Sequence, residues 1–192
     1  MEIERVGFAD TGRVASALAD AFDGYEWTAH TVAADDHHAR VRRTFEAYLR
    51  LLLVPAGTAW MTWDRRAAAL WTPPEPPLPS AEEHAELASI VEEAAGDRWA
   101  ANAAAEAALA PHRPTEPCWV LESLGTEPAF RRTRHATALL DDGLDRVDAD
   151  GVPAFLETCG DVNVAFYLRF GFQITAATDL EEGPTVFSMV RT

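Results

Sequence analysis

The sequence predicts an α/β fold: one domain over residues 1–192, with a mixed central sheet flanked by helices and one inserted helical pair. Three observations predict it. Strand-like and helix-like patterns alternate along the chain. Two proline-rich segments, WTPPEPPLPS at 71–80 and PHRPTEP at 111–117, enclose the inserted pair. The segment 156–172, LETCGDVNVAFYLRFGF, reads as a buried strand, a polar turn and a helix that Gly171 ends.

In the first half of the chain, the sequence pattern predicts one strand, then two helices, and then a hairpin of two strands. Val14, Leu18 and Phe22 recur at helical spacing, and the tight turn at 64–66 joins two apolar runs. The predicted elements are a strand over Ile3–Phe8, a helix from Asp10 to Phe22, an aromatic-rich loop beginning at Tyr25, a helix from Asp35 to Leu52, and a hairpin of Thr58–Trp63 and Ala67–Thr72.

The second half predicts helices and strands in alternation. Ser80 and Glu83 form a capping-box pattern that opens a helix. The further predicted elements are a helix over Asp97–Leu109, a strand over Cys118–Thr126, a helix over Thr133–Asp148, a strand over Pro153–Thr158, a short helix before Gly171, and strands over Gln173–Thr178 and Thr185–Val190.

In the short helix, Val162, Phe166 and Phe170 recur every four residues and predict one apolar face. Tyr167 falls off that face, so its phenol is expected to point elsewhere and to be free for other work. The alternative is an ordinary, partly buried tyrosine.

Composition narrows the classes of partner. The formal net charge of −15 argues against nucleic acid and anionic membranes, and it suits a cationic substrate such as an amine. No apolar run approaches the roughly 20 residues of a membrane span, and the start shows no signal-peptide pattern, so a cytoplasmic protein is expected. The two cysteines are expected to be reduced and buried. His37 and His38 are adjacent and cannot share a helix face, so no metal site is expected.

A strand, a helix carrying N-x-x-x-Y from Asn163 to Tyr167, and a following Gly-Phe resemble the acyl-CoA half of the GNAT acetyltransferase family. The resemblance implies a donor, acetyl-CoA, and a role for Tyr167 as proton donor to the departing thiolate. It also implies that backbone groups of Leu124, Gly125 and Thr126 meet the acyl carbonyl and pantetheine arm. Asn163 would lie near the same arm, or alternatively serve as a polar residue at the helix start.

The family opens its central helix with a loop Q/R-x-x-G-x-G/A whose N–H groups bind pyrophosphate. The aligned residues here run from Arg131 to Ala136, namely Arg131, Arg132, Thr133, Arg134, His135 and Ala136, with Thr137 following. Arg132 and Arg134 stand where glycines are usual. Two hypotheses follow: the guanidinium groups replace backbone recognition of phosphate, or they obstruct the site.

Glu122 is the candidate base, because a carboxylate in the apolar strand WVLESL is costly unless it is paired or used. A salt-bridged edge residue is the alternative. Tyr25, Trp27, Trp71 and Trp99 are candidates for an aromatic acceptor pocket, with core or surface positions as the alternative for each.

Over nearly its full length the chain also resembles the puromycin-modifying group within this family, through words such as AFDGYEWTAHTV, LAPHRPTEP and EGPTVFSM. That resemblance implies transfer of an acetyl group from acetyl-CoA to a primary amine of a small molecule, an antibiotic or natural-product intermediate, by an actinobacterial monomer or homodimer. The alternative is a reused fold that does not depend on acetyl-CoA and that binds a ligand or catalyses another step.

Overall fold

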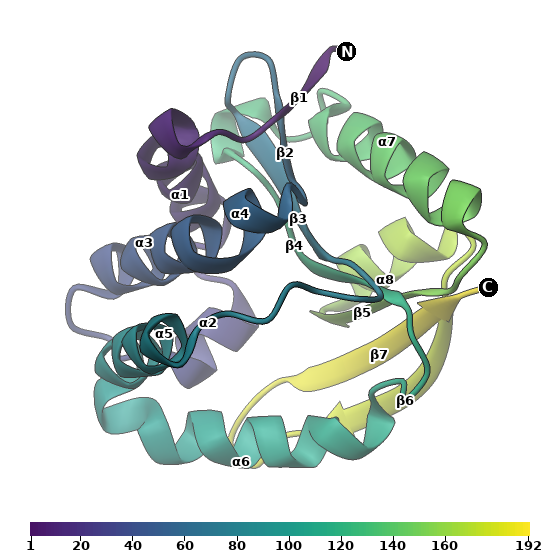
Figure 1. The fold of residues 1–192 in the computed structure, drawn as a ribbon. Coiled ribbons are helices and arrows are strands. Elements are labelled where there is room, and N and C mark those ends of the chain that lie inside the picture. Colours follow the sequence, from purple (N-terminus) through teal and green to yellow (C-terminus); the bar gives the residue numbers. More distant parts are fainter.

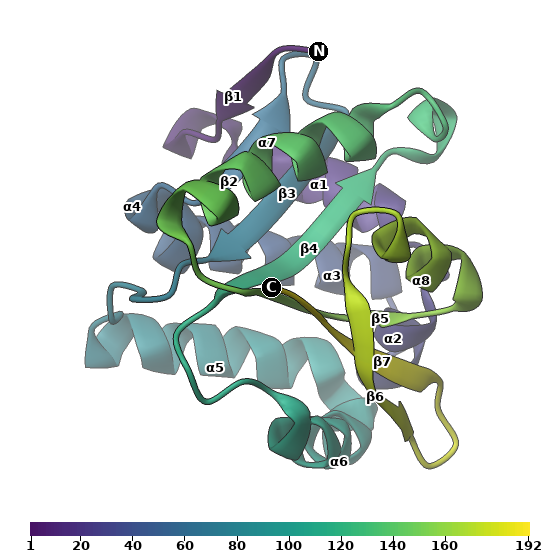
Figure 2. The same ribbon diagram turned by 90° about the vertical axis from the view of Figure 1, so that its right-hand side faces the viewer.

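The computed structural model describes all residues, 1–192, and its centre is a seven-stranded mixed sheet. The strand order is β1-β2-β3-β4-β5-β7-β6, and only the β4–β5 pair is parallel. Figure 1 and Figure 2 show this strongly twisted sheet between two helical layers. The strands are β1 (Ile3–Arg5), β2 (Ala59–Thr62), β3 (Ala67–Thr72), β4 (Trp119–Thr126), β5 (Ala154–Cys159), β6 (Gln173–Asp179) and β7 (Thr185–Arg191).

Helices cover both faces of the sheet, as predicted. One layer holds α1 (Thr11–Ala21) and α3 (His37–Tyr48), and Val14 and Leu18 of α1 pack on Met61 and Leu70. The other holds α7 (His135–Asp150) and α8 (Asp161–Leu168), packed on the tryptophans of β2, β3 and β4. Each layer buries an apolar helix face against an apolar sheet face, which is the main stabilising term.

The inserted helical pair lies below these layers (Figure 1). The capping box opens α5 (Ala81–Ala95): Ser80 Oγ accepts from the Glu83 N–H at 3.2 Å, and Glu83 accepts from the Ser80 N–H at 2.8 Å. The following helix, α6 (Trp99–Leu109), packs Ala105 and Leu109 against Cys159 and Val186.

Two local predictions are wrong. The segment from Tyr25 is not a loop, because Glu26–Thr31 forms the short helix α2. Its six residues are too few to show a periodic pattern, and Thr28 and Thr31 satisfy local backbone carbonyls with their hydroxyls. The first strand is also shorter than Ile3–Phe8, because a 3₁₀ turn replaces its end at Phe8–Asp10.

The buried face of α8 is also not the one predicted. Val162 is 84% exposed, whereas Val164 and Tyr167 belong to the main hydrophobic core. Phe166 and Phe170 pack only at the margin of that core. A period of three residues from Val164 to Tyr167 therefore sets the inward face, which a helix of 3.6 residues per turn allows equally well.

The predicted helix from Asp35 to Leu52 is confirmed, but its last part is irregular. After Tyr48 the chain makes a π-helical turn over Leu49–Leu53, and α4 (Val54–Ala56) then ends at Gly57. Pi-helical turns are rare and often occur at functional sites.

The strands β4 and β5 separate after a short pairing. Only Trp119–Leu121 of β4 pair with Ala154–Leu156 of β5, although β4 continues to Thr126 and β5 to Cys159. The C-terminal parts of both strands diverge in Figure 2, leaving a wedge in the middle of the sheet. This wedge positions the candidate site.

Candidate active site

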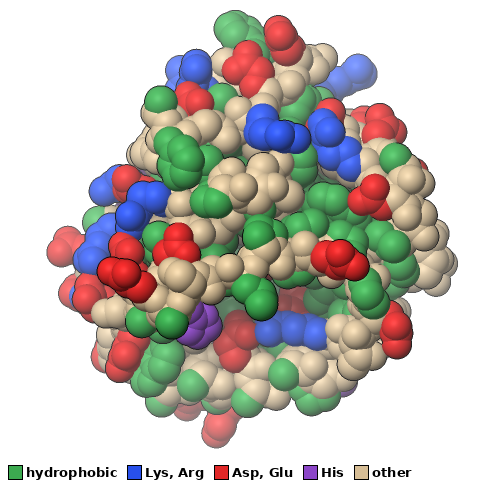
Figure 3. All heavy atoms as spheres, in the orientation of Figure 1, with side chains coloured by type: hydrophobic (Ala, Val, Ile, Leu, Met, Phe, Trp, Pro, Cys, Tyr) green, Lys and Arg blue, Asp and Glu red, His purple; other side chains and the backbone are tan.

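A cavity of about 1370 Å³ fills the wedge between β4 and β5. Its walls come from the C-terminal parts of both strands, the α1–α2 corner, α3, α5, α6, α8 and the loop before α7. Figure 3 shows a hollow between the body of the molecule and the inserted helical pair, with charged side chains at its edge. Ligand sites of ordinary size occupy about 300–1,000 Å³, so this cavity is larger than a typical site for one small ligand.

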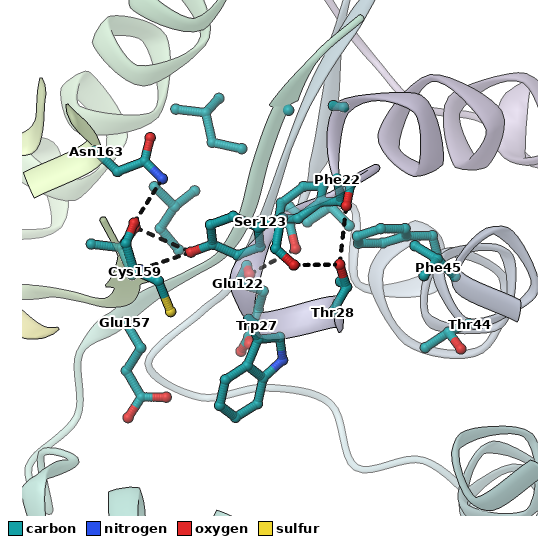
Figure 4. Close-up of a pocket in the computed structure, with 18 of the residues that line it drawn as sticks. Phe22, Trp27, Thr28, Thr44, Phe45, Glu122, Ser123, Glu157, Cys159 and Asn163 are labelled. Atoms are coloured by element: carbon teal, nitrogen blue, oxygen red, sulfur yellow. Dashed lines mark hydrogen bonds between the residues drawn. The ribbon is translucent and has the colours of Figure 1, made fainter. Parts of the chain in front are cut away.

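Glu122 lies at a β-bulge in β4. Leu70 pairs with Ser123 and Trp71 with Leu121, which leaves Glu122 as the extra residue of the strand. The bulge turns its carboxylate into the cavity (Figure 4), where it accepts a 2.7 Å hydrogen bond from the Thr72 hydroxyl and forms no salt bridge. Burial raises the pKa of Glu122, and the Thr72 hydrogen bond and the Arg113 charge offset only part of that rise. The Glu122 side chain is exposed to the cavity, yet the protein around the cavity desolvates its carboxylate. This is why an exposed side chain has a raised pKa.

Tyr167 points from α8 toward the same cavity, which it lines although its ring is in the core. The rings of Phe166 and Phe172 meet it edge to face, at centroid distances of 5.2 and 5.8 Å. Burial, and then the nearby Tyr25, raise the pKa of the Tyr167 phenol well above its usual value. The phenol therefore keeps its proton at neutral pH, as a proton donor must.

The loop before α7 has the backbone shape of a glycine-rich loop without its glycines. Arg132 has φ 64° and Arg134 has φ 72°, both in the left-handed region. The six N–H groups from Arg132 to Thr137 form no hydrogen bond within the protein. The Arg132 and Arg134 side chains are exposed, and Arg131 donates to the Ala21 carbonyl at 2.9 Å. Consecutive free N–H groups at a helix start suit an anion, so this loop fits a pyrophosphate.

The remaining cofactor candidates lie between this loop and Glu122. Leu124, Gly125 and Thr126 line the cavity on the edge of β4 that has no partner in β5. Gly125 allows α1 to approach closely, because a Cβ there would lie 2.8 Å from Leu18 Cδ2. Asn163 donates to the Cys159 carbonyl at 3.0 Å across the start of α8 (Figure 4).

The structure brings three of the four predicted acceptor residues to the cavity and leaves one outside it. Tyr25, Trp27 and Trp99 line the cavity. The Tyr25 hydroxyl accepts a 2.8 Å hydrogen bond from the Cys159 N–H. The prediction for Trp71 is wrong: its ring is 1% exposed and packs against Gly143 of α7, on the other face of the sheet. Strand alternation at the end of β3 turned it inward.

The cavity also contains polar groups that sequence reasoning missed. Arg113 donates two hydrogen bonds to Glu157, at 2.8 and 3.1 Å, and one to Glu106 at 2.8 Å. Tyr48, at the start of the π-helical turn, faces this cluster: burial raises its pKa to about 12, with a further rise from the charges of Glu122 and Glu106. These residues come from four separate elements, so no spacing in the sequence connects them. In the sequence, only the arginine within the proline-rich connector, Arg113, could have indicated this cluster. In the structure, the π-helical turn after Tyr48 indicates it.

Two further observations concern metal ligands and membrane-spanning helices. No group of three or more His, Cys, Asp or Glu residues is placed to hold a metal ion. None of the helices has both the length and the apolar character needed to cross a membrane.

Comparison with known proteins identifies the family. Residues 46–172 match the family model of the acetyltransferase (GNAT) family. The match covers most of the chain, including β4, the loop before α7, and α8. The chain therefore belongs to the GNAT acetyltransferase family.

Solved structures share the whole fold. An acetyltransferase from Corynebacterium glutamicum, described as histone acetyltransferase HPA2 and related acetyltransferase, superposes with a TM-score of 0.74 at 21% identity, over 98% of this chain and 94% of that one. The polyamine N-acetyltransferase of Drosophila melanogaster gives 0.62 at 18% identity, over 98% of both chains. The PaiA N-acetyltransferase of Thermoplasma acidophilum, solved with coenzyme A, gives 0.59 at 12% identity, over 100% and 98%. At these identities the likeness shows the fold.

Proposed function

We propose that this single-domain protein transfers the acetyl group of acetyl-CoA to a primary amine of a small molecule. The observation that carries the proposal is one cavity with two ends. Six free N–H groups, from Arg132 to Thr137, lie at one end, and Glu122 and Tyr167 face the same space. This arrangement supplies an anion site, a base and an acid within one enclosure.

The donor end of the cavity fits coenzyme A. The N–H groups of the loop would hold the pyrophosphate, and the exposed guanidinium groups of Arg132 and Arg134 add positive charge there. The unpaired edge of β4 at Leu124–Thr126, together with Asn163, would contact the pantetheine arm. When bound, the donor supplies an activated acetyl thioester.

Two side chains would move protons in the reaction. Glu122 would accept a proton from the attacking ammonium, because its raised pKa makes it a better base than an exposed carboxylate. Tyr167 would donate a proton to the leaving thiolate, since it is protonated at neutral pH and has no competing hydrogen bond in the protein.

The acceptor end favours an amine with an apolar body. Trp27, Phe45, Tyr48 and Trp99 provide apolar and aromatic walls, and Glu122 provides an ionisable carboxylate with no cationic partner of its own. A carboxylate that the surrounding protein desolvates is costly unless it is paired, and a substrate ammonium supplies that pair. The resemblance to the puromycin-modifying group points to an antibiotic or natural-product amine. Several solved relatives, such as the polyamine enzyme above, are named for action on amines. Use of acetyl-CoA further suggests a cytoplasmic enzyme, working as a monomer or homodimer.

The competing proposal is that the protein keeps this fold but no longer uses acetyl-CoA. The presence of Arg132 and Arg134 in place of loop glycines favours it. Calorimetric titration with acetyl-CoA separates the two proposals. We expect saturable binding, and thiol release when a panel of primary amines is added. No heat of binding at millimolar acetyl-CoA would exclude the acetyltransferase and favour the reused fold.

A further inference from the structure

A chain of hydrogen bonds connects the β2–β3 turn to the loop before α7. Asp64, in the turn, contacts His135 Nε2 through Oδ2 at 3.0 Å. The other ring nitrogen, His135 Nδ1, lies 2.7 Å from the Thr133 hydroxyl, which in turn bonds to the Phe130 carbonyl. His135 is 7% exposed, so the protein supplies these partners and solvent does not. We name this set the Asp64–His135–Thr133 chain.

The loop needs such a support because it contains no glycine. Left-handed backbone costs an ordinary residue free energy that glycine does not lose, so surrounding contacts must impose it. Arg132 and Arg134 both adopt it, and Thr133 lies between them. Thr133 and His135 are the loop residues whose side chains are tied to Phe130 and to the hairpin turn. Edge-to-face packing of Phe130 on His135, at 5.9 Å, fixes the other side of the turn.

We propose that Asp64, His135 and Thr133 are positioning residues that hold the loop in the shape that exposes its six N–H groups to the donor. The inference rests on the proposed function for the identity of the ligand. Its structural content, that the chain imposes the left-handed conformations, does not depend on any ligand.

The hydrogen bonds of the chain have definite directions. A carbonyl only accepts, so the Thr133 hydroxyl donates to Phe130 and must accept from His135 Nδ1–H. The Thr62 hydroxyl and the Arg66 N–H donate to Asp64 as well. Partial burial acts to raise the pKa of Asp64, but the hydrogen bonds from His135 and Thr62 outweigh it and lower the pKa, so Asp64 is ionised and accepts from Nε2–H. The chain therefore links the ionised Asp64 to the Thr133 hydroxyl through the two ring nitrogens of His135.

The other charged side chains around the chain come from the hairpin, α1, the segment after β4 and the loop itself. Arg66 of the hairpin lies 4.8 Å over the Phe130 ring and pairs with Glu127, which also pairs with Arg13 of α1. Arg131, Arg132 and Arg134 flank it in the loop itself. The chain therefore lies among ion pairs that hold the hairpin, α1 and the loop together.

The test compares Thr133→Val, which removes the hydroxyl, with Thr133→Ser, which retains it. Arg65→Gln is the matched control, because it breaks the 2.8 Å Arg65–Asp10 pair from the same hairpin turn without touching the chain. We expect Thr133→Val to weaken coenzyme A binding, measured by calorimetry, about tenfold. Arg65→Gln should bind like the parent, and Thr133→Ser, which keeps the hydroxyl, should restore the affinity that Thr133→Val loses. In steady-state assays the loss should appear in the donor KM and leave kcat nearly unchanged.

A second measurement needs no donor. The Cα chemical shifts of Arg132 and Arg134 report their left-handed backbone, and Thr133→Val should move both toward ordinary helical values while Thr133→Ser preserves them. Thr133→Val with parental shifts and parental affinity would overturn the inference. If the parent itself binds no coenzyme A, the proposed function fails, and the chemical shifts alone decide whether the chain positions the loop.

Discussion

Replacing Arg134 by glycine is expected to move stability and donor affinity in opposite directions. Arg134 is the N-cap of α7, with φ 72° and ψ 7°. The left-handed conformation costs a non-glycine residue about 1–2 kcal/mol. Glycine removes that cost but loses about 0.5–1 kcal/mol more backbone entropy on folding. The difference predicts a net gain of about 0.5–1 kcal/mol in the free energy of unfolding, or roughly 1–4 °C in Tm for a domain of this size.

Donor affinity should fall in the same variant. The Arg134 side chain is exposed, and the structure already places its backbone in the conformation that glycine would adopt. The substitution therefore removes a positive charge without opening a closed site. Exposed ion pairs contribute about 0.2–1 kcal/mol, which predicts about a two- to fivefold weaker binding of acetyl-CoA, with a shallower dependence on salt than in the parent.

Arg134→Ala is the matched control, since it removes the same charge and keeps the left-handed strain. It should lose the same affinity without the gain in Tm. Thermal unfolding and calorimetric titration at low and high salt measure both effects. Tighter donor binding by Arg134→Gly would refute this reasoning and would mean that the side chain obstructs the loop.

Three further substitutions test other parts of the site and its support. Tyr167→Phe keeps the ring in the core but removes the proton donor, so kcat should fall about a hundredfold or more while calorimetry shows unchanged acetyl-CoA affinity; an unchanged kcat would remove Tyr167 from the mechanism. Glu122→Gln should abolish the rise in rate that the parent shows as pH increases through the raised pKa of Glu122. The pKa of Glu122 is higher in the folded protein than in the unfolded chain, so its ionisation lowers stability as the pH rises between these two values. The Gln variant should therefore also melt at a higher temperature than the parent at neutral pH, and a lower Tm would contradict this. Gly143→Ala should destabilise the protein by about 1–3 kcal/mol, measured by urea unfolding, because the new Cβ would lie 2.8 Å from the buried Trp71 ring. An unchanged midpoint would show that α7 can shift away from β3.

Patterns of repeating apolar residues predicted most of the fold, and they were wrong where the segments are short. The helices starting near Thr11, Ser80 and Thr133 were predicted within a few residues. In α2, six residues make fewer than two turns, and their pattern did not differ from that of a loop. In α8, apolar residues recur both every four residues from Val162 and every three from Val164. The four-residue spacing predicts a face without Tyr167, whereas Tyr167 is buried and Val162 is exposed.

The candidate site was predictable only where its residues share one segment of the family pattern. Tyr167 and the loop from Arg131 to Ala136 each belong to such a segment. Glu122 is conspicuous in the sequence as a charge in an apolar strand, but the bulge that turns it into the cavity depends on pairing with β3. Tyr48 and Arg113 are brought to the cavity by tertiary packing alone, and Trp71 shows that an aromatic residue next to a proline-rich segment is equally suited to the core.

The inserted helices α5 and α6 have a consequence for how this protein can change its substrate. Their apolar side chains, such as Leu87 and Val91, line the proposed acceptor end of the cavity, while the loop before α7, Glu122 and Tyr167 belong to other elements. The proline-rich segments at 71–80 and 111–117 join the pair to β3 and β4 as stiff connectors. Under the proposed function, residues 81–109 therefore form an exchangeable module: its sequence can vary, in evolution or in the laboratory, and select different amines while the residues proposed for acyl transfer stay unaltered.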